Sequence, residues 1–237
     1  MRVEIIGDCT LHLGDMRDIV PSLSAVKSTI TDLPYALESG GNTTGQMGGK
    51  FDKANYDNSG KIIECDITFE EIMPIIADVM PHGHAYSMVN NRYVRKAIAT
   101  SEQAGLHFHN LLVWDKGTGT PNRWYMKNCE FTVFMSTGKA FYINDCGSRQ
   151  LIKCPNILNA FHETEKPVAL MEHYVVNSTK RGETVLDPFM GVGSTGIACA
   201  NSGRKFIGCE IVPKYFDEAC RRIERAYAAP SLFLEAV

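Results

Sequence analysis

The chain has 237 residues, of which 44% are hydrophobic, and its formal net charge at pH 7 is −3. This length is enough for one α/β domain with a substantial core. No apolar stretch is long enough to span a membrane, and residues 1–8 are too acidic and too poor in apolar side chains for a signal peptide. The eight cysteines include no C-x-x-C pair, which indicates reduced thiols in the cytoplasm. The negative net charge excludes a strongly basic nucleic-acid binder, so any charge that binds DNA must be local.

An acid, a proline and an aromatic ring stand at the end of a predicted strand. Residues 26–31 are predicted to form a strand that delivers Asp32 to its carboxyl end, where open α/β sheets bind ligands. The Asp32 carboxylate and the Leu33 carbonyl can each accept a hydrogen bond from the exocyclic amine of a base, which would favour its tetrahedral transition state. Pro34 would stiffen the turn and Tyr35 would stack on the base. An ordinary strand-to-loop turn is the alternative interpretation.

The middle of the chain alternates between strand and helix patterns. Residues 39–61 are rich in glycine, asparagine and aspartate, and are interpreted either as a lid over a bound base or as a surface loop. The next expected elements are a helix from a capping box at Thr68 to Val79, a strand at 84–89, a helix at 92–104 and strands at 107–114 and 130–135. This alternation predicts an α/β fold, a single domain over residues 1–237 with a mostly parallel, doubly wound sheet.

Cations and aromatic rings are concentrated in residues 116–127. Flexible loops with both kinds of side chain suit a DNA backbone or an unstacked base, whereas the alternative is a solvated loop whose rings enter the core. The candidate DNA-binding residues of this segment are Lys116, Arg123, Trp124 and Lys127. Two histidine pairs, His82 with His84 and His107 with His109, lack a nearby set of carboxylates, so no metal site is predicted.

A glycine-rich turn near the end of the chain predicts a site for a nucleotide-like cofactor. A short strand at 183–186 leads to Asp187-Pro188-Phe189 and then to the G-x-G-x-x-G pattern of residues 191–196. Glycines in this pattern allow a tight turn, close approach of the ligand and close packing of helix on strand. The next strand, 205–210, ends in Glu210, where a carboxylate would meet ribose hydroxyls. The last helix is expected from Pro213 to about residue 228.

The position and the charge of this turn select among cofactors. Too little chain follows it to complete a dinucleotide fold. Asp187 at the mouth of the cleft would repel a pyrophosphate but would accept a hydrogen bond from an ammonium group. S-adenosylmethionine carries an ammonium and no phosphate, so it is the predicted cofactor.

Read together, the two motifs resemble the amino-type DNA methyltransferases of bacteria and phages, which methylate adenine N6 or cytosine N4. The catalytic motif precedes the cofactor motif, as in the β arrangement of that family. Three further segments match in order: Gly14-Asp15, the L-V-W-x-K strand at 112–116 and the H-P-T-x-K-P segment at 162–167. The departures are Leu33 and Glu163, each of which stands where the family has proline.

The resemblance implies a Rossmann-like fold that binds S-adenosylmethionine, with Asp15 at the adenine of the cofactor and Lys166 at its methionine end. It also implies a short target-recognition segment at 136–161. The expected catalytic residues are Asp32, Leu33, Pro34 and Tyr35. The expected cofactor-binding residues are Asp15, Lys166, Asp187, Pro188, Phe189, Gly191, Gly193, Ser194, Thr195 and Glu210.

The predicted function is therefore methylation of adenine N6 in DNA, because an aspartate at position 32 resembles the adenine enzymes more than the cytosine N4 enzymes. The alternatives are cytosine N4 methylation, amino methylation of RNA or of a protein glutamine, and a non-catalytic relative. The intact Asp32, Pro34 and Tyr35 argue against the last. The predicted partner is DNA, with no membrane, and the short recognition segment implies either a short site or a homodimer that shares the duplex.

Overall fold

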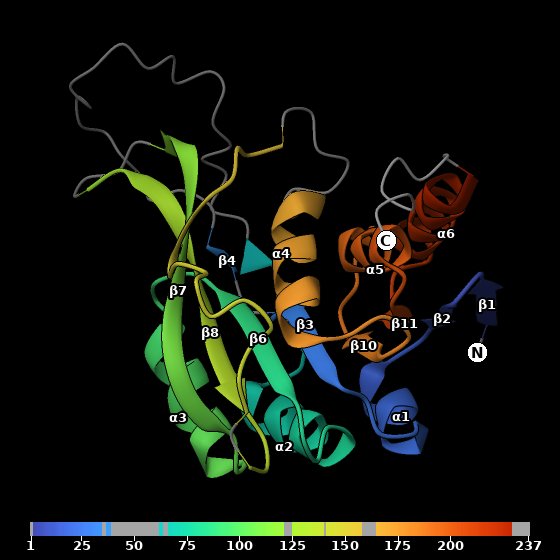
Figure 1. Ribbon diagram of the computed structural model, residues 1–237, viewed down its shortest axis with the longest axis horizontal. Coiled ribbons are helices and arrows are strands. Elements are labelled where there is room, and N and C mark those ends of the chain that lie inside the picture. Colours follow the sequence, from blue (N-terminus) through green and yellow to red (C-terminus); the bar gives the residue numbers. More distant parts are fainter. Residues whose placement is uncertain are drawn as a thin grey trace.

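The computed structural model describes residues 2–34, 37–38, 62–63, 66–120, 125–139, 141–157 and 165–228. The strands form a nine-stranded sheet in the order β1-β2-β11-β10-β3-β6-β8-β7-β9 and a two-stranded sheet of β4 and β5. Figure 1 shows how the helices and strands are arranged. The strands are β1 (Arg2–Ile6), β2 (Cys9–Leu13), β3 (Ser28–Asp32), β4 (Leu37–Glu38), β5 (Ile62–Ile63), β6 (His84–Val89), β7 (His107–Thr120), β8 (Lys127–Ser136), β9 (Leu151–Lys153), β10 (Thr184–Asp187) and β11 (Lys205–Glu210). The helices are α1 (Met16–Ile19), the 3₁₀ turn η1 (Val20–Ser22), α2 (Phe69–Val79), α3 (Val94–Gln103), α4 (Val168–Ser178), α5 (Ser194–Ser202) and α6 (Pro213–Ala228).

The large sheet is mostly parallel, which confirms the predicted α/β class. Strands β2, β11, β10, β3 and β6 pair in parallel, and β9 pairs in parallel with β7. Antiparallel pairing occurs at β1 with β2 and where β8 lies between β6 and β7. Strand β6 is buried at every position, as expected for a strand that helices cover on both faces.

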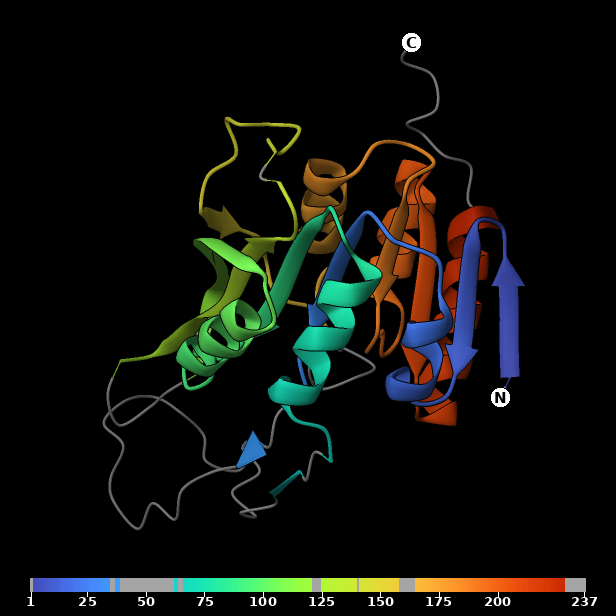
Figure 2. The ribbon, with the colours of Figure 1, turned by 90° about the horizontal axis from the view of Figure 1, so that it is seen from below.

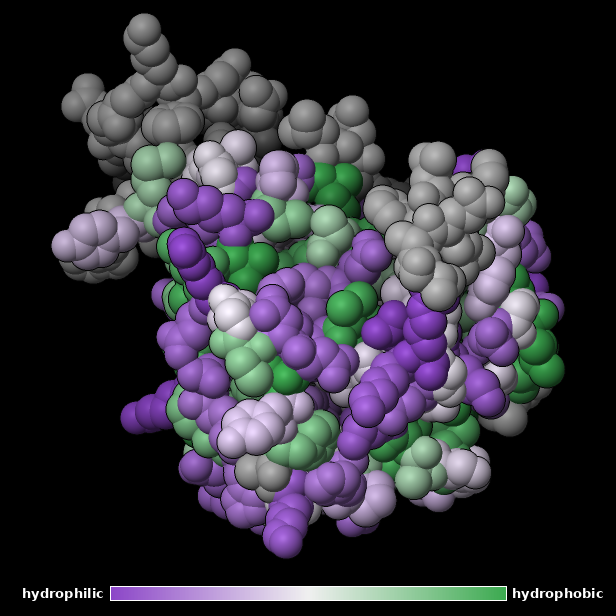
Figure 3. Space-filling view, viewed as in Figure 1, coloured by the Kyte–Doolittle hydropathy of each residue, from purple (hydrophilic) through white to green (hydrophobic). Residues whose placement is uncertain are grey.

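Helices cover both faces of the sheet, as Figure 2 shows from below. Helices α4, α5 and α6 pack on one face around a core that includes Tyr174, Phe206 and Phe216. Helices α1, α2 and α3 pack on the other face, where α2 contributes Ile72 and Met73. Successive side chains of a strand point to opposite faces, so each central strand contributes to both cores. On the face of the molecule that Figure 3 shows, in the same view as Figure 1, hydrophilic and hydrophobic residues are mixed.

The chain turns in opposite directions after β3 and after β10. From β3 it passes through α2 to β6 on one side, and from β10 it passes through α5 to β11 on the other. Strands β3 and β10 are parallel neighbours, with Val185 opposite Ser28 and Leu186 opposite Thr29. The crevice at their carboxyl ends is therefore the topological switch point, where open α/β sheets bind ligands.

Close packing of α5 requires a glycine at position 196. A Cβ atom there would lie 2.5 Å from Ile223 Cδ1 of α6 and 2.9 Å from Phe206 Cε1 of β11. The glycine pattern thus brings α5 against both neighbours, as the sequence predicts for its third glycine.

Several elements differ from those predicted. The helix α4 and the strands β1, β2 and β9 were not predicted from the sequence, and residues 116–120 extend β7 where a loop was expected. The capping box of α2 is confirmed, since both the backbone N–H and the hydroxyl of Thr68 donate to Glu71 Oε2, at 2.8 and 2.7 Å. In the part of the chain that the structure describes, no helix combines the length and the apolar character needed to cross a membrane.

The end of α6 lies against the turn between β1 and β2. The Asp8 backbone N–H donates to the Tyr227 hydroxyl over 2.9 Å. Gly7 adopts φ +56°, and a Cβ there would lie 2.4 Å from the Tyr227 ring, so both the backbone conformation and the close contact require glycine. Segments from the two ends of the described chain are thereby held together.

Candidate active site

The two motif strands deliver their acids side by side. Asp32 is the last residue of β3 and Asp187 the last residue of β10. The Thr31 hydroxyl, one residue before Asp32, donates to Asp187 Oδ1 over 2.8 Å. A buried hydrogen bond therefore joins the predicted catalytic strand to the predicted cofactor strand at the switch point.

Asp187 is buried and accepts hydrogen bonds from residues on both sides of the glycine turn. Its residue is 4% exposed, and its other donors are the Thr195 hydroxyl, 2.7 Å from Oδ2, and the Phe189 N–H, 3.2 Å from Oδ1. Burial raises the pKa of Asp187 to about 6, although the hydrogen bonds from Thr195 and Thr31 oppose this shift. The sequence placed this carboxylate at the mouth of the cleft facing an ammonium. In the structure its oxygens face protein donors instead.

The glycine turn has an open side. Gly191 and Gly193 have φ values of +52° and +81°, which favour glycine, and a Cβ on Gly191 would meet no atom within 4 Å. Beside this turn, the Ser194 hydroxyl is buried and has no hydrogen-bond partner among the described residues. Buried polar groups are normally paired, so the Ser194 hydroxyl at the start of α5 is an exception beside the glycine turn.

A pocket of about 210 Å³ lies at this edge of the sheet and gathers residues from both motifs. Of the predicted site residues, it is lined by Asp15, Pro34, Pro188, Phe189 and Glu210. Pro34 from the catalytic motif thus shares a wall with Pro188 and Phe189 from the cofactor motif. The structure therefore brings the two motifs to one pocket, although they are more than 150 residues apart in the sequence.

Glu210 stands at the end of β11 in this pocket. Its Oε1 accepts from the Val212 N–H over 2.7 Å, and burial raises its pKa while backbone hydrogen bonds oppose the shift. The Gly14 N–H donates to the Glu210 carbonyl over 2.9 Å, so the loop that carries Asp15 begins beside it. This arrangement puts the carboxylates of Asp15 and Glu210 in one pocket.

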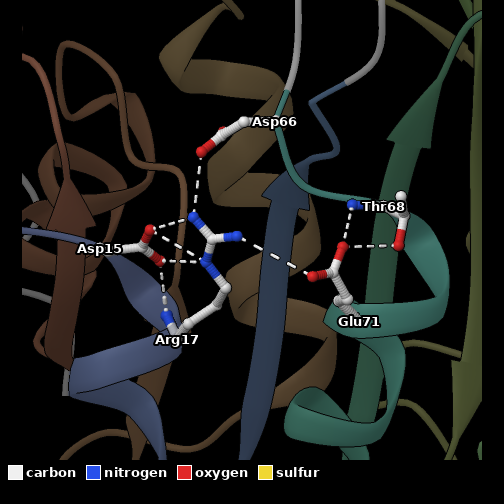
Figure 4. A network of polar contacts seen from close by, with 5 residues as sticks. All are labelled: Asp15, Arg17, Asp66, Thr68 and Glu71. Atoms are coloured by element: carbon white, nitrogen blue, oxygen red, sulfur yellow. Dashed lines mark hydrogen bonds and ion pairs between the residues drawn. The ribbon is translucent and has the colours of Figure 1, made fainter.

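Asp15 has an arginine partner that the sequence did not reveal (Figure 4). It caps α1 by accepting from the Arg17 N–H at 2.8 Å, and its Oδ2 accepts from Arg17 Nη2 at 2.5 Å. The same guanidinium lies 3.0 Å from Asp66 Oδ2 and 3.9 Å from Glu71 Oε1. The hydrogen bond from the Arg17 side chain is the main reason that the pKa of Asp15 is lowered. Arg17 thus connects Asp15, which lines the pocket, with Glu71 in the first turn of α2.

Asp32 is paired with a buried lysine. Lys166 Nζ donates to Asp32 Oδ2 over 2.6 Å, and the lysine side chain is 7% exposed. Burial raises the pKa of Asp32, while the charge of Lys166 and its hydrogen bond oppose that shift. Lys166 Nζ also lies 3.3 Å from Glu130 Oε2. Lys166 was predicted at the methionine end of the cofactor, and in the structure its ammonium group lies at the Asp32 carboxylate.

Leu33 and the predicted DNA-binding lysines differ in their exposure. The Leu33 N–H donates to the Met88 carbonyl over 3.1 Å and its side chain is buried, which fixes the backbone after Asp32. Lys116 Nζ lies 3.1 Å from Glu130 Oε1 and its side chain is 15% exposed, which argues against a direct contact with phosphate. Lys127, at the start of β8, is exposed.

Some predictions lie outside the described residues. These are Tyr35 of the catalytic motif, Arg123 and Trp124 of the DNA-binding segment, and the loop at 39–61. Among the described residues, no group of three or more histidine, cysteine, aspartate or glutamate side chains could hold a metal ion.

The predicted recognition segment begins at the opposite edge of the sheet. Strand β8 ends at Ser136, which pairs with His84 at the start of β6. Beyond it, the Asn144 N–H donates to the Asn177 carbonyl at 2.9 Å, and its side-chain amide donates to the Thr179 carbonyl, also at 2.9 Å. Residues 141–150 are therefore attached to the end of α4, away from the pocket, while the β7–β8 hairpin reaches the pocket edge.

The geometry defines an α/β enzyme fold with a ligand pocket and an acid at its switch point, and comparison with known proteins gives the family. Residues 26–221 match the family model described as DNA methylase, for enzymes acting at N6 or N4. The chain belongs to this family of amino-type DNA methyltransferases. It is similar to the type II methyltransferase M2.DpnII of Streptococcus pneumoniae, at 26% identity over 81% of this chain and 80% of that one. It is also similar to the type II methyltransferase M.HpaI of Haemophilus parainfluenzae, at 24% identity over 86% and 70%.

Solved structures share the fold. The M1.HpyAVI–SAM complex superposes with a TM-score of 0.70 at 24% identity and covers 90% of this chain and 99% of that one. The cytosine-N4-specific PvuII DNA methyltransferase superposes with a TM-score of 0.69 at 15% identity and covers 94% and 92%. The predicted Rossmann-like methyltransferase fold is confirmed.

Proposed function

We propose that this protein transfers a methyl group from S-adenosylmethionine to N6 of adenine in DNA. The observation that carries the proposal is the position of Asp32 beside the cofactor turn, across the Thr31–Asp187 hydrogen bond. The unpaired Ser194 hydroxyl and the open side of Gly191 fit a bound cofactor at that turn. Similarity to a protein whose structure contains SAM supports the same cofactor.

Glu210 and Asp15 are proposed to hold the nucleoside end of the cofactor. Backbone N–H groups hold the Glu210 carboxylate in place, and this carboxylate is proposed to accept from a ribose hydroxyl. Asp15 would accept from the adenine amine in the plane that Arg17 fixes. Pro188 and Phe189 supply the apolar wall, and Thr195 acts indirectly by holding Asp187 in place.

The chain's own groups can activate the target amine. Lys166 occupies Oδ2 of Asp32, and no described donor is bonded to Oδ1, so Oδ1 is the acceptor proposed for one amine N–H. The Leu33 carbonyl would accept the other. Two acceptors favour the tetrahedral nitrogen, whose lone pair attacks the methyl group as the C–S bond breaks and one N–H proton leaves. The cofactor supplies that methyl group on a positively charged sulfur.

The DNA contacts are proposed to come from the β7–β8 hairpin. Thr120 and Lys127 pair at the pocket edge of the sheet, and Lys127 and Tyr125 are exposed there. Arg123 and Trp124 belong to the same segment of the sequence. Because the target base is stacked inside a duplex, it must be extruded before Asp32 can reach it. The few local cations imply weak binding that depends steeply on salt, with a short recognition site or a second copy sharing the duplex.

Adenine is proposed over cytosine because of the aspartate at position 32. One structural relative is specific for cytosine N4, so the two bases must be distinguished by experiment. DNA from a host that expresses the protein should contain N6-methyladenine by mass spectrometry, and DNA from a host that expresses Asp32→Ala should not. Finding N4-methylcytosine without N6-methyladenine would overturn the choice of base. Finding neither would overturn the proposed activity.

A further inference from the structure

Four charged side chains form a row that alternates in sign and ends at the catalytic carboxylate. Asp32 Oδ2 lies 2.6 Å from Lys166 Nζ, which lies 3.3 Å from Glu130 Oε2. Glu130 Oε1 in turn lies 3.1 Å from Lys116 Nζ. The side chains of the four residues are between 7% and 30% exposed, so solvent screens these pairs less than it screens surface ion pairs.

The sheet order brings these residues together. Strands β3, β6, β8 and β7 are consecutive, and Asp32 is opposite Met88, which is opposite Thr132 of β8. Because β8 is antiparallel to β6, Glu130 lies two residues further toward the pocket edge than Thr132. Glu130 is thus fixed in a strand, whereas Lys166 stands in the segment just before α4.

Sharing of one ammonium by two carboxylates has a chemical consequence. With Glu130 present, Lys166 Nζ divides its donors between two acids. Without Glu130, the positive charge of Lys166 would act more strongly on Asp32 and would weaken it as an acceptor for the target amine. Lys116 binds the far oxygen of Glu130 and so holds Glu130 in line with Lys166.

We propose that Glu130 is a positioning residue for methyl transfer, which holds Lys166 between two acids so that Asp32 stays oriented through Oδ2 and strongly accepting at Oδ1. This inference rests on the proposed function. The charged groups that face Asp32 are Lys166 from the segment before α4, Glu130 from β8 and Asp187 from the neighbouring strand β10. Among them, Glu130 is the acid that acts through Lys166.

The test uses the full chain and three variants. Glu130→Gln removes the charge and keeps the shape, Glu130→Asp keeps the charge, and Glu102→Gln removes the charge of an exposed residue of α3 as the matched control. Single-turnover methyl transfer to DNA is measured as a function of pH, together with the affinity for S-adenosylmethionine by calorimetry. The titration of Asp32 is followed by NMR on carboxyl-labelled protein.

We expect Glu130→Gln to lower the maximal rate and to leave cofactor affinity unchanged. The negative charge of Glu130 raises the pKa of Asp32, so its removal lowers that pKa. The acidic limb of the rate profile, where Asp32 becomes protonated, should therefore move to lower pH. Glu130→Asp should return the limb to its wild-type position and recover part of the rate, and Glu102→Gln should match the wild type.

An unchanged rate and limb in Glu130→Gln, beside an active wild type, would overturn the inference alone. A rate loss of equal size in both Glu130 variants, without movement of the limb, would show a structural role and would also overturn it. A wild type that methylates no base would overturn the proposed function instead. In that case an Asp32 titration that does not move in Glu130→Gln would overturn the inference as well.

Discussion

Replacing Thr31 with valine tests the buried hydrogen bond that joins the two motif strands. Valine keeps the shape and the β-branch of threonine, so strand β3 should form as before. The change removes the donor 2.8 Å from Asp187 Oδ1 and leaves the Thr195 hydroxyl and the Phe189 N–H. Thr31 is fully buried and Asp187 is 4% exposed, so water does not readily replace the lost donor.

The expected loss depends on pH because Asp187 titrates. Its pKa rises from 3.8 to about 6 on folding, and at roughly 1.4 kcal/mol for each pKa unit the ionised carboxylate already costs about 3 kcal/mol of stability. A raised acid pKa means that this cost is absent below the unfolded pKa and grows as pH rises through the folded pKa. Loss of a donor to the ionised group costs about 1.5–3 kcal/mol, and to the neutral group about 0.5–1.5 kcal/mol.

Urea unfolding of the wild type and of Thr31→Val is compared at pH 5 and at pH 8. The loss of stability in Thr31→Val should be larger at pH 8, where Asp187 is ionised, than at pH 5. The matched control is Thr29→Val on the same strand, since Thr29 is 1% exposed and its hydroxyl donates to the weak acceptor Met80 Sδ at 3.8 Å. The control should be close to wild type at both pH values. An equal loss for Thr31→Val at the two pH values, or a loss as large in the control, would refute the role assigned to Asp187.

Four further outcomes are expected. Asp32→Ala should abolish methyl transfer and leave the dissociation constant of S-adenosylmethionine unchanged by calorimetry, because Asp32 acts on the amine; retained turnover would contradict the mechanism. Glu210→Ala should weaken cofactor binding at least tenfold, since each charge-assisted hydrogen bond contributes about 1.5–3 kcal/mol, and unchanged affinity in the same titration would exclude Glu210 from the site. Lys127→Gln should reduce the slope of log affinity against log salt by about one in DNA-binding measurements, whereas Lys116→Gln should not; an unchanged Lys127 slope would exclude the hairpin. Gly196→Ala should lower the free energy of unfolding in urea by about 1–3 kcal/mol, because its Cβ would lie 2.5 Å from Ile223 Cδ1; a stable variant would contradict that packing.

The parts of the fold that the sequence revealed are those with a local signal. The turn at 191–196 needs glycine for its backbone and its packing, so the pattern is visible in the chain itself. Strand β6 and strand β11 were predicted with their observed bounds because each is an apolar run between turn residues. Helix α4 was missed because its segment, V-A-L-M-E-H-Y-V-V-N-S, is apolar on most sides and rich in valine, which is typical of strands.

The charges of the site depend on sheet order, which no local pattern encodes. Lys166 was assigned to the cofactor and Lys116 to DNA because each was read alone. Their shared partner, Glu130, is separated from Lys166 by 36 positions in the sequence and becomes its neighbour only when β8 lies next to β6. Arg17 was similarly overlooked, because the pairing with Asp66 across 49 positions requires α2 to begin beside α1.

The contact between Asp8 and Tyr227 bears on how the gene for such a protein can be rearranged. It holds the end of α6 beside the first hairpin, over a hydrogen bond of 2.9 Å. The strands that end in Asp32 and Asp187 pair side by side in the sheet and are not joined by a connecting loop. A circular permutant, joined near residues 2 and 228 and opened in a surface turn between the two motifs, would therefore encode the cofactor motif first and keep the same sheet. The order of the two motifs along the chain can therefore change in evolution, whereas the strands that carry them must remain adjacent in the sheet.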